Sequence, residues 1–170
     1  LNWFFAPSTF MPAEDGSYHS KSNLAKEIYC IVLDDVGQKV SFEKILPCPP
    51  TWVIQTSPGS CQVGYAFDEG QKDFQCVEQL KNALISAGMC DPGATGASAR
   101  WSRLPVGING KPKYGVPEPH CKLLWWQPNL KYSVADLIEL LSLSSSQSSK
   151  LSSISFALSK YFSISESRSL

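Results

Sequence analysis

A short, continuously apolar segment that ends in two acids constrains the fold of this chain more than any other part of the sequence. Residues 28–33 read IYCIVL and are followed by Asp34, Asp35 and, two positions later, Gly37. A run of apolar and β-branched residues without polar alternation is typical of a strand that is covered on both faces. We therefore expect a buried strand whose end presents carboxylates.

Other strand and helix patterns surround this run. Residues 52–56 and 62–67 are two strand patterns separated by the turn residues 57–60, which predicts a β-hairpin. Apolar residues recur every three or four positions across 72–87, which predicts a helix that ends at Gly88. Shorter patterns predict an edge strand at 2–5, a strand at 121–126 and a helix that starts at Ser133.

Strands interspersed with two amphipathic helices predict an α+β or mixed α/β fold, with a small sheet of about five or six strands covered by helices. A chain of 170 residues is long enough for one domain with its own core, which we assign to residues 1–143. From residue 144 serine dominates and no period persists, so we expect 144–170 to be a disordered or loosely helical tail. Because the chain starts with Leu1, we expect it to be a fragment.

Charge does not separate the main classes of function. Fifteen Lys and Arg balance fifteen Asp and Glu, so the overall basic charge typical of nucleic-acid-binding proteins is absent. A basic surface can still form locally, because cations concentrate in the second half of the sequence. These cations are Lys81, Arg100, Arg103, Lys111, Lys113, Lys122 and Lys131.

The six cysteines show neither a C-x-x-C pair nor the Cys/His spacing of a zinc site. Their even number fits an extracellular, disulfide-stabilised domain, which is one alternative. Cys30 and Cys76 fall inside apolar patterns and we expect no signal peptide, which favours reduced thiols in a cytosol. No apolar run approaches the roughly 20 residues that a membrane-spanning helix needs.

Residues 103–111, which read RLPVGINGK, have the composition of a phosphate-binding segment. Arg103 offers a planar fork for two phosphate oxygens, and Lys111 adds a point charge on a flexible stem. The two glycines allow close backbone approach, and Asn109 can bond a ribose hydroxyl or brace the loop. Alternatively, Arg103 is an ion-paired arginine on a strand, and Arg100 replaces or assists it.

Three segments in order carry a family resemblance: VLDDVGQK at 32–39, TSPGSCQVGY at 56–65 and RLPVGINGK at 103–111. Across residues 2–141 the chain resembles the primase domain of plasmid RepB-type replication proteins and phage primase-polymerases, within the archaeo-eukaryotic primase superfamily. The resemblance implies an RRM-like core, Mg²⁺ or Mn²⁺ as cofactor, and template-directed synthesis of primers. It also implies nucleoside triphosphates, a single-stranded DNA template and a replicative helicase module as partners, in the cytoplasm of a bacterial host.

The resemblance assigns metal binding and catalysis to Asp34, Asp35 and Asp91. Acids at this strand end usually lie one residue apart in the superfamily, whereas here they are adjacent. Neighbours in a regular strand face opposite ways, so only one acid serves unless the strand breaks, which Gly37 allows. Each aspartate also fits an ordinary turn. The adjacent acids therefore favour, as a competing function, a catalytically inactive nucleic-acid-binding module of the same fold.

The resemblance places Ser57, Gln62, Arg103, Asn109 and Lys111 around the nucleotide. Ser57 and Gln62 match the second motif, in which many superfamily members have histidine instead of glutamine. An amide donates hydrogen bonds but moves no proton, so Gln62 is expected to position the substrate, or else to be an ordinary surface residue.

Tryptophans supply a second kind of contact to nucleic acid. Trp101, Trp125 and Trp126 are expected either to stack on template bases or to belong to the core. Trp125 and Trp126 face opposite sides of a strand, so at most one of them is free to stack.

Overall fold

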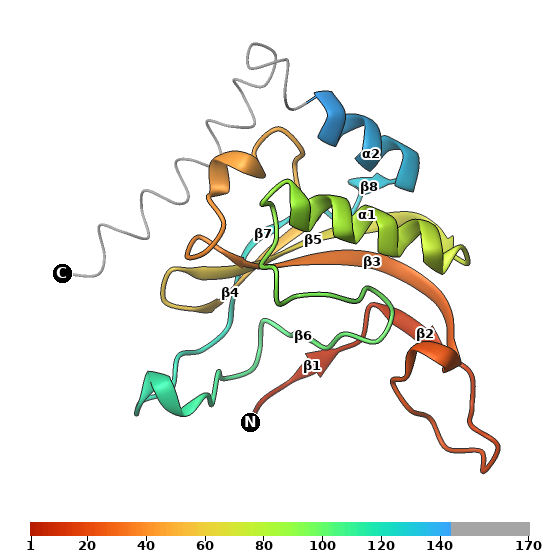
Figure 1. The fold of residues 1–170 in the computed structure, drawn as a ribbon. Coiled ribbons are helices and arrows are strands. Elements are labelled where there is room, and N and C mark those ends of the chain that lie inside the picture. Colours follow the sequence, from red (N-terminus) through yellow and green to blue (C-terminus); the bar gives the residue numbers. More distant parts are fainter. Residues whose placement is uncertain (144–170) are drawn as a thin grey trace.

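A computed structural model describes residues 1–143 of the chain. A mixed sheet lies between two helices, above it in Figure 1, and two short strands below it. The predicted α+β class is thereby confirmed. The elements are β1 (Phe4–Phe5), β2 (Ser8–Phe10), β3 (Ala25–Val36), β4 (Trp52–Ser57), β5 (Ser60–Gln71), α1 (Phe74–Ser86), β6 (Ser102–Arg103), β7 (Lys122–Trp126), β8 (Lys131–Tyr132) and α2 (Val134–Leu143).

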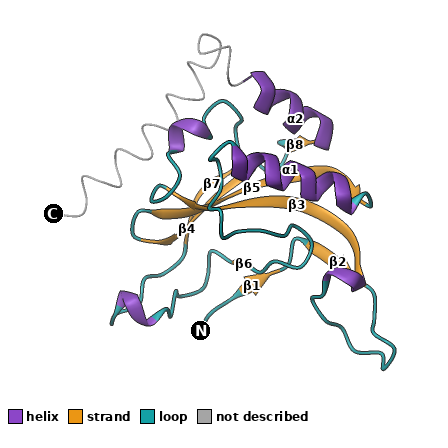
Figure 2. Cartoon of the chain, viewed as in Figure 1, coloured by secondary structure: helices purple, strands orange, loops and turns teal. Residues whose placement is uncertain are grey.

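The main sheet has the strand order β2-β3-β5-β4-β7, and β8 pairs with β5 in parallel (Figure 2). The other pairs of this sheet are antiparallel. The predicted hairpin is β4–β5, and its turn contains Gly59 at a φ of 71°, a left-handed conformation that glycine adopts without strain. Strands β1 and β6 form a separate antiparallel pair, with Phe4 opposite Arg103.

Strand β3 is covered on both faces, as its apolar sequence predicts. Ile31 and Leu33 belong to the main core beneath the helices, whereas Cys30 and Val32 belong to a smaller cluster on the opposite face. Because side chains alternate along a strand, Asp34 follows Val32 onto the face that the helices do not cover.

The two helices have the boundaries that their capping residues specify. The side chain of Asp73 accepts a hydrogen bond from the Cys76 backbone N–H and so caps α1, and Gly88 follows that helix at a φ of 67°. Ser133 and Asp136 form a reciprocal capping box at the start of α2. Val77, Leu80 and Leu84 of α1 pack on the sheet.

On the opposite face, Trp52 covers Gly64 of the neighbouring strand. A Cβ atom at Gly64 would overlap the indole ring of Trp52. Phe5 meets the same indole edge-on, with ring centroids 6.2 Å apart. The absence of a side chain at Gly64 therefore lets the tryptophan lie flat on the sheet and lets the N-terminal strand pack over it.

The remaining expectations concern thiols, membrane spans and the tail. All six cysteines are free, and all except Cys76 are buried. Within residues 1–143 no helix combines the length and apolarity needed to cross a bilayer. The predicted serine-rich tail, 144–170, lies outside the described residues.

Candidate active site

The end of β3 departs from regular strand geometry at its two acids. Asp35 has a φ of 56°, in the left-handed region, and the pairing with β5 shifts register between Leu33 and Val36. Aspartate is one of the few residues other than glycine that adopt this conformation readily. The irregularity brings Asp34 and Asp35 into one cluster of polar side chains.

Asp34 is held by groups from three segments. Its Oδ2 atom accepts a hydrogen bond from Arg100 at 2.8 Å, and its Oδ1 atom accepts one from the Gln62 amide at 3.5 Å. The Asp34 carbonyl oxygen accepts a hydrogen bond from the Asp91 backbone N–H at 3.2 Å. The loop after α1 is thereby fixed beside the end of β3.

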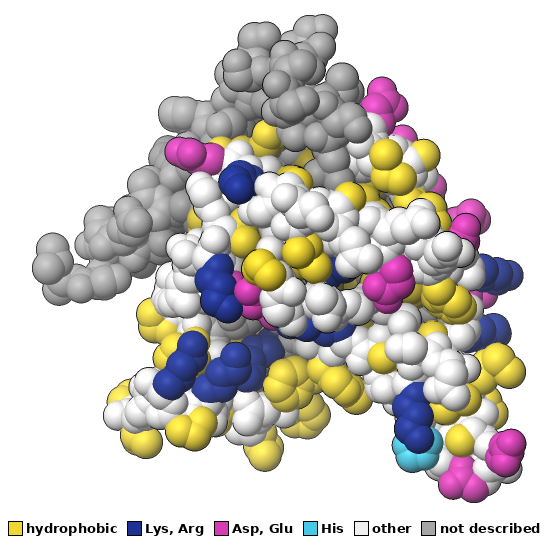
Figure 3. Space-filling view, viewed as in Figure 1, with side chains coloured by type: hydrophobic (Ala, Val, Ile, Leu, Met, Phe, Trp, Pro, Cys, Tyr) yellow, Lys and Arg dark blue, Asp and Glu magenta, His cyan; other side chains and the backbone are white. Residues whose placement is uncertain are grey.

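Lys39 joins the other two acids. Its Nζ atom lies 3.1 Å from Asp35 Oδ2 and 3.0 Å from Asp91 Oδ2. The two carboxylates therefore flank one cation position. Arg100 pairs with Asp34 at the same strand end, so three acids and two cations lie near the end of β3. Figure 3 shows basic (dark blue) and acidic (magenta) side chains next to one another on one face of the molecule.

The carboxyl of Asp35 and the ammonium of Lys39 stabilise each other's charge. Burial raises the pKa of Asp35, but hydrogen bonds from Lys39 and Ser60, with the charges of Lys39 and Lys111, outweigh burial and lower it. Hydrogen bonds to Asp91 and Asp35 raise the pKa of Lys39. Both groups are therefore ionised at neutral pH.

The β4–β5 hairpin carries two buried serines near its turn, of which the resemblance implied only Ser57. The buried Ser57 hydroxyl accepts a hydrogen bond from Tyr114 at 2.9 Å. Ser60 is also buried, and its hydroxyl donates to Asp35 Oδ1 at 2.9 Å. In the sequence, Ser60 is the last of the turn residues 57–60, and this position could have marked it as a candidate beside Ser57.

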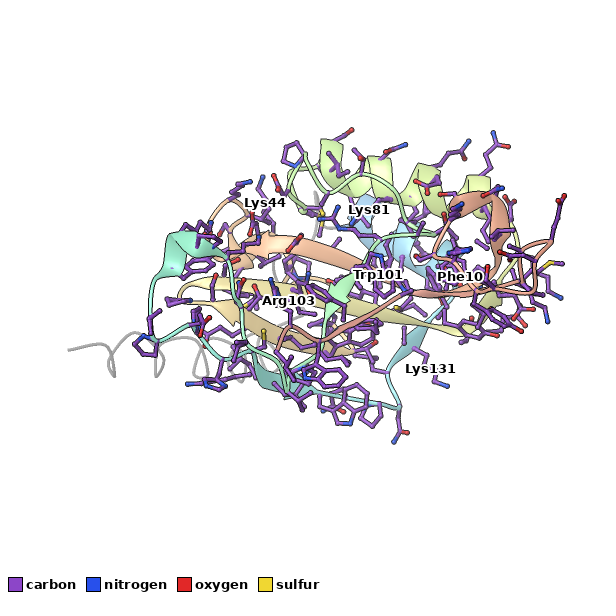
Figure 4. The ribbon with its side chains drawn as sticks, turned by 90° about the horizontal axis from the view of Figure 1, so that it is seen from below. Phe10, Lys44, Lys81, Trp101, Arg103 and Lys131 are labelled. Atoms are coloured by element: carbon purple, nitrogen blue, oxygen red, sulfur yellow. The ribbon has the colours of Figure 1, made fainter. Side chains whose placement is uncertain are left out.

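Arg103 and Asn109 point into the protein. Arg103 donates hydrogen bonds to Asn2 Oδ1, the Ile108 carbonyl and Asn109 Oδ1, and its guanidinium lies 4.8 Å from the centroid of the Phe4 ring. Asn109 in turn donates to the Thr56 carbonyl at 2.8 Å. The bonds of Arg103 and Asn109 attach the 103–111 segment to the N-terminus and to β4. Figure 4 shows Arg103 and the buried Lys81 on opposite sides of β3.

Gln62 connects this attachment to the acids. Its side-chain oxygen accepts a hydrogen bond from the Arg103 backbone N–H at 2.8 Å, while its amide group faces Asp34. Lys111 is exposed, and its charge acts on Asp35. Arg100, just before the 103–111 segment, and Lys111, at its end, are therefore the cations from this part of the chain that act on the carboxylates.

A divalent ion fits the donors of this site only if Lys39 moves. Within residues 1–143, no three Asp, Glu, His or Cys side chains are arranged closely enough to hold a metal ion. Asp35 and Asp91 nevertheless supply carboxylate oxygens on two sides of one cation position, and such hard oxygen donors suit Mg²⁺ and Mn²⁺.

An apolar groove continues the same face of the sheet. Its volume is about 400 Å³, and Trp126 on its rim is 56% exposed. Trp125 faces the other way, where it packs on the main core and donates a hydrogen bond to the Pro50 carbonyl. The lining residues are Phe5, Trp52, Ile54, Leu104, Pro105, Leu123 and Trp126.

Solved structures share this arrangement of strands and helices. The primase-polymerase domain of cyanophage S-2L superposes with a TM-score of 0.58 at 12% identity, over 82% of this chain and 70% of that one. The chain has a RepB-like primase-polymerase fold.

Two structures of primase RepB′ have the same primase-polymerase fold. One superposes with a TM-score of 0.52 at 19% identity, over 93% of this chain and 49% of that one, so this chain spans about half of it. The other, the catalytic domain in complex with initiator DNA, superposes at 0.51 with 18% identity, over 94% and 68% of the two chains. No protein-family model and no curated protein sequence matches the chain.

Proposed function

We propose that this chain is the DNA primase or primase-polymerase domain of a phage or plasmid replication protein, working in the cytoplasm of a bacterial host. The reaction is template-directed nucleotidyl transfer, which joins nucleoside triphosphates into a primer. The observation that carries the proposal is that Lys39 pairs with Asp35 and Asp91, and Arg100 pairs with Asp34, at the end of β3 in a primase-type sheet.

In this proposal the acids hold Mg²⁺ or Mn²⁺, and the chain's cations hold the triphosphate. A bound divalent ion supplies activation of the 3′ hydroxyl and stabilisation of the pyrophosphate leaving group. Arg100 and Lys111 orient the phosphates, because both are partly or fully exposed beside the carboxylates. Gln62, which contacts Asp34, helps to hold the acids in place, and Ser57 is proposed to support the nucleotide from the same hairpin.

Arg103 and Asn109 have a supporting role in the proposal. Their polar atoms already bond within the chain, and both side chains are buried. They keep the 103–111 segment against the sheet, so that Lys111 faces the acids. Direct phosphate contact is therefore assigned to Arg100 and Lys111, with Arg103 acting through the segment that it anchors.

The template strand is assigned to the apolar groove lined by β4, β7 and the segment after β6. Exposed Trp126 offers a ring for base stacking, and exposed Lys122 next to Leu123 offers a charge for the phosphate backbone. The related RepB′ catalytic domain was solved with initiator DNA, which supports DNA as the partner.

Primer synthesis by variants tests the catalytic assignment. Asp34→Ala is expected to abolish synthesis on a single-stranded template with Mn²⁺ and nucleoside triphosphates, while far-ultraviolet circular dichroism and the melting temperature stay near those of wild type. Asp68→Ala, at an exposed acid of β5, is the matched control and should retain synthesis. Unchanged synthesis by a folded Asp34→Ala variant rules out the mechanism.

A second function, nucleic-acid binding without catalysis, is favoured by the pairing of the acids with Lys39 and Arg100 within the chain. Calorimetric titration separates the two functions. Affinity for single-stranded DNA without affinity for a triphosphate in the presence of Mn²⁺ supports the binding module, whereas affinity for both supports the primase.

A further inference from the structure

The Lys39 ammonium lies between two of the carboxylates that would hold a divalent ion. It contacts Asp35 Oδ2 at 3.1 Å and Asp91 Oδ2 at 3.0 Å, and so links the end of β3 to the loop after α1. Two anions held on either side of one cation repel each other once that cation leaves. The lysine therefore holds the carboxylates in place for as long as no other cation binds between them.

The backbone of Lys39 is fixed, but its ammonium group is accessible to solvent. The Lys39 backbone N–H donates a hydrogen bond to the Asp35 carbonyl, within a turn that the Gly37 to Val40 bond closes. The side chain is 58% exposed. A lysine stem has four rotatable carbons, so its tip can move several ångströms around an anchored Cα atom. The ion pairs can therefore exchange without any change in the fold.

Local charge determines what an incoming metal ion must do. Three carboxylates face three cations, Lys39, Arg100 and the nearby Lys111, so the cluster carries about no net charge before a metal ion binds. A divalent ion that takes its place between Asp35 and Asp91 has to displace the Lys39 ammonium. Because its backbone is anchored in the turn, the displaced ammonium would remain within reach of the phosphates of a bound nucleotide, which carry negative charge.

We propose that Lys39 is an exchangeable counter-ion: it holds Asp35 and Asp91 together in the metal-free protein, is displaced by the divalent ion, and then binds the triphosphate. This inference rests on the proposed function and adds a coupling between its two ligands. Lys39 opposes binding of the metal alone and supports binding of the nucleotide in its presence. Coupling of binding free energies is reciprocal, so the triphosphate strengthens metal binding to the same extent.

Isothermal titration of two ligands tests the exchange. Lys39→Met should bind Mn²⁺ alone about two- to tenfold more tightly than wild type, the scale of two exposed ion pairs. With Mn²⁺ saturating, the same variant should bind a non-hydrolysable nucleoside triphosphate more weakly by a factor of about the same size. Lys39→Arg keeps the charge and should stay near wild type in both titrations.

Lys72→Met is the matched control, because Lys72 is an exposed lysine paired with Glu27 near the opposite end of β3. It should change neither affinity. Weakening of both affinities in a folded Lys39→Met variant would show that the lysine is only a structural tie and would overturn the exchange, as would two unchanged affinities. Wild-type protein that binds neither Mn²⁺ nor triphosphate would instead remove the proposed function, and the exchange with it.

Discussion

Replacing Arg103 by methionine is expected to destabilise the fold more than it weakens any single contact with substrate. Arg103 as a whole residue is only 8% exposed. Its guanidinium donates hydrogen bonds to Asn2 Oδ1 at 2.9 Å, to the Ile108 carbonyl at 3.0 Å and to Asn109 Oδ1 at 2.8 Å. Methionine fills much of the same space but donates no hydrogen bond. Arg103→Met therefore leaves three acceptors without this donor.

The size of the effect follows from those bonds. A hydrogen bond from a charged donor contributes about 1.5–3 kcal/mol, and three bonds to one group are not additive. The partners of Arg103 are neutral oxygens, so its removal leaves no unpaired buried charge but does leave acceptors without their donor. We therefore expect Arg103→Met to cost about 1.5–3 kcal/mol. Arg103→Lys keeps a charge but lacks the planar fork, so we expect an intermediate loss.

Urea unfolding followed by tryptophan fluorescence measures this loss, because the chain has five tryptophans. Arg100→Met is the matched control: it removes one ion pair with Asp34 at a partly exposed site, and should cost no more than about 1 kcal/mol. If Arg103→Met lowers the free energy of unfolding by less than about 1 kcal/mol and also weakens triphosphate binding, then Arg103 contacts the substrate and does not act by anchoring the 103–111 segment.

Three further outcomes are expected. Gly64→Ala should lower the free energy of unfolding by about 1–3 kcal/mol, because its methyl group overlaps the Trp52 indole; unchanged urea stability would contradict that overlap. Burial raises the pKa of the Cys30 thiol from 9.0 to about 12, so its stabilising contribution is complete below pH 9 and is lost at about 1.4 kcal/mol per pH unit as the pH rises towards 12. Unfolding at pH 8 and 10.5 should show a steeper decline for wild type than for Cys30→Ala, and parallel declines would refute the assignment. Trp126→Ala should weaken single-stranded DNA binding by about 1–3 kcal/mol in a fluorescence-anisotropy titration, whereas Tyr18→Ala, at another exposed aromatic, should leave it unchanged; equal effects would remove the stacking role.

The sequence predicted the elements whose signals are local. Strand β3 was evident from its unbroken apolar run, and α1 from apolar spacing and Gly88, because burial of one face and the end of a helix leave marks on adjacent residues. Gly37 indicated that the strand can break after the acids, but it did not specify the left-handed conformation of Asp35. Local pattern alone does not say how a strand ends.

The contacts of the candidate site were less accessible because they join distant segments. Lys39 meets Asp91 across 52 positions, and Arg103 meets Asn2 across 101. Nothing in the RLPVGINGK segment distinguishes an arginine that faces phosphate from one that faces an asparagine near the N-terminus, since both need the same fork of donors. The assignments of Asp34, Asp35, Asp91 and the phosphate-binding residues stay predictions until variants are measured.

The pairing of β1 with β6 has a consequence for synthesis of the chain. Phe4 and Phe5 meet partners that lie close to 100 residues further on, at Ser102 and Arg103. At a translation rate of about 5–20 residues per second, roughly 5–20 s pass between the synthesis of β1 and the synthesis of its partner strand β6. During that interval β1 is an unprotected apolar segment of the kind that chaperones bind, so the yield of folded protein should depend on growth temperature and on chaperone supply.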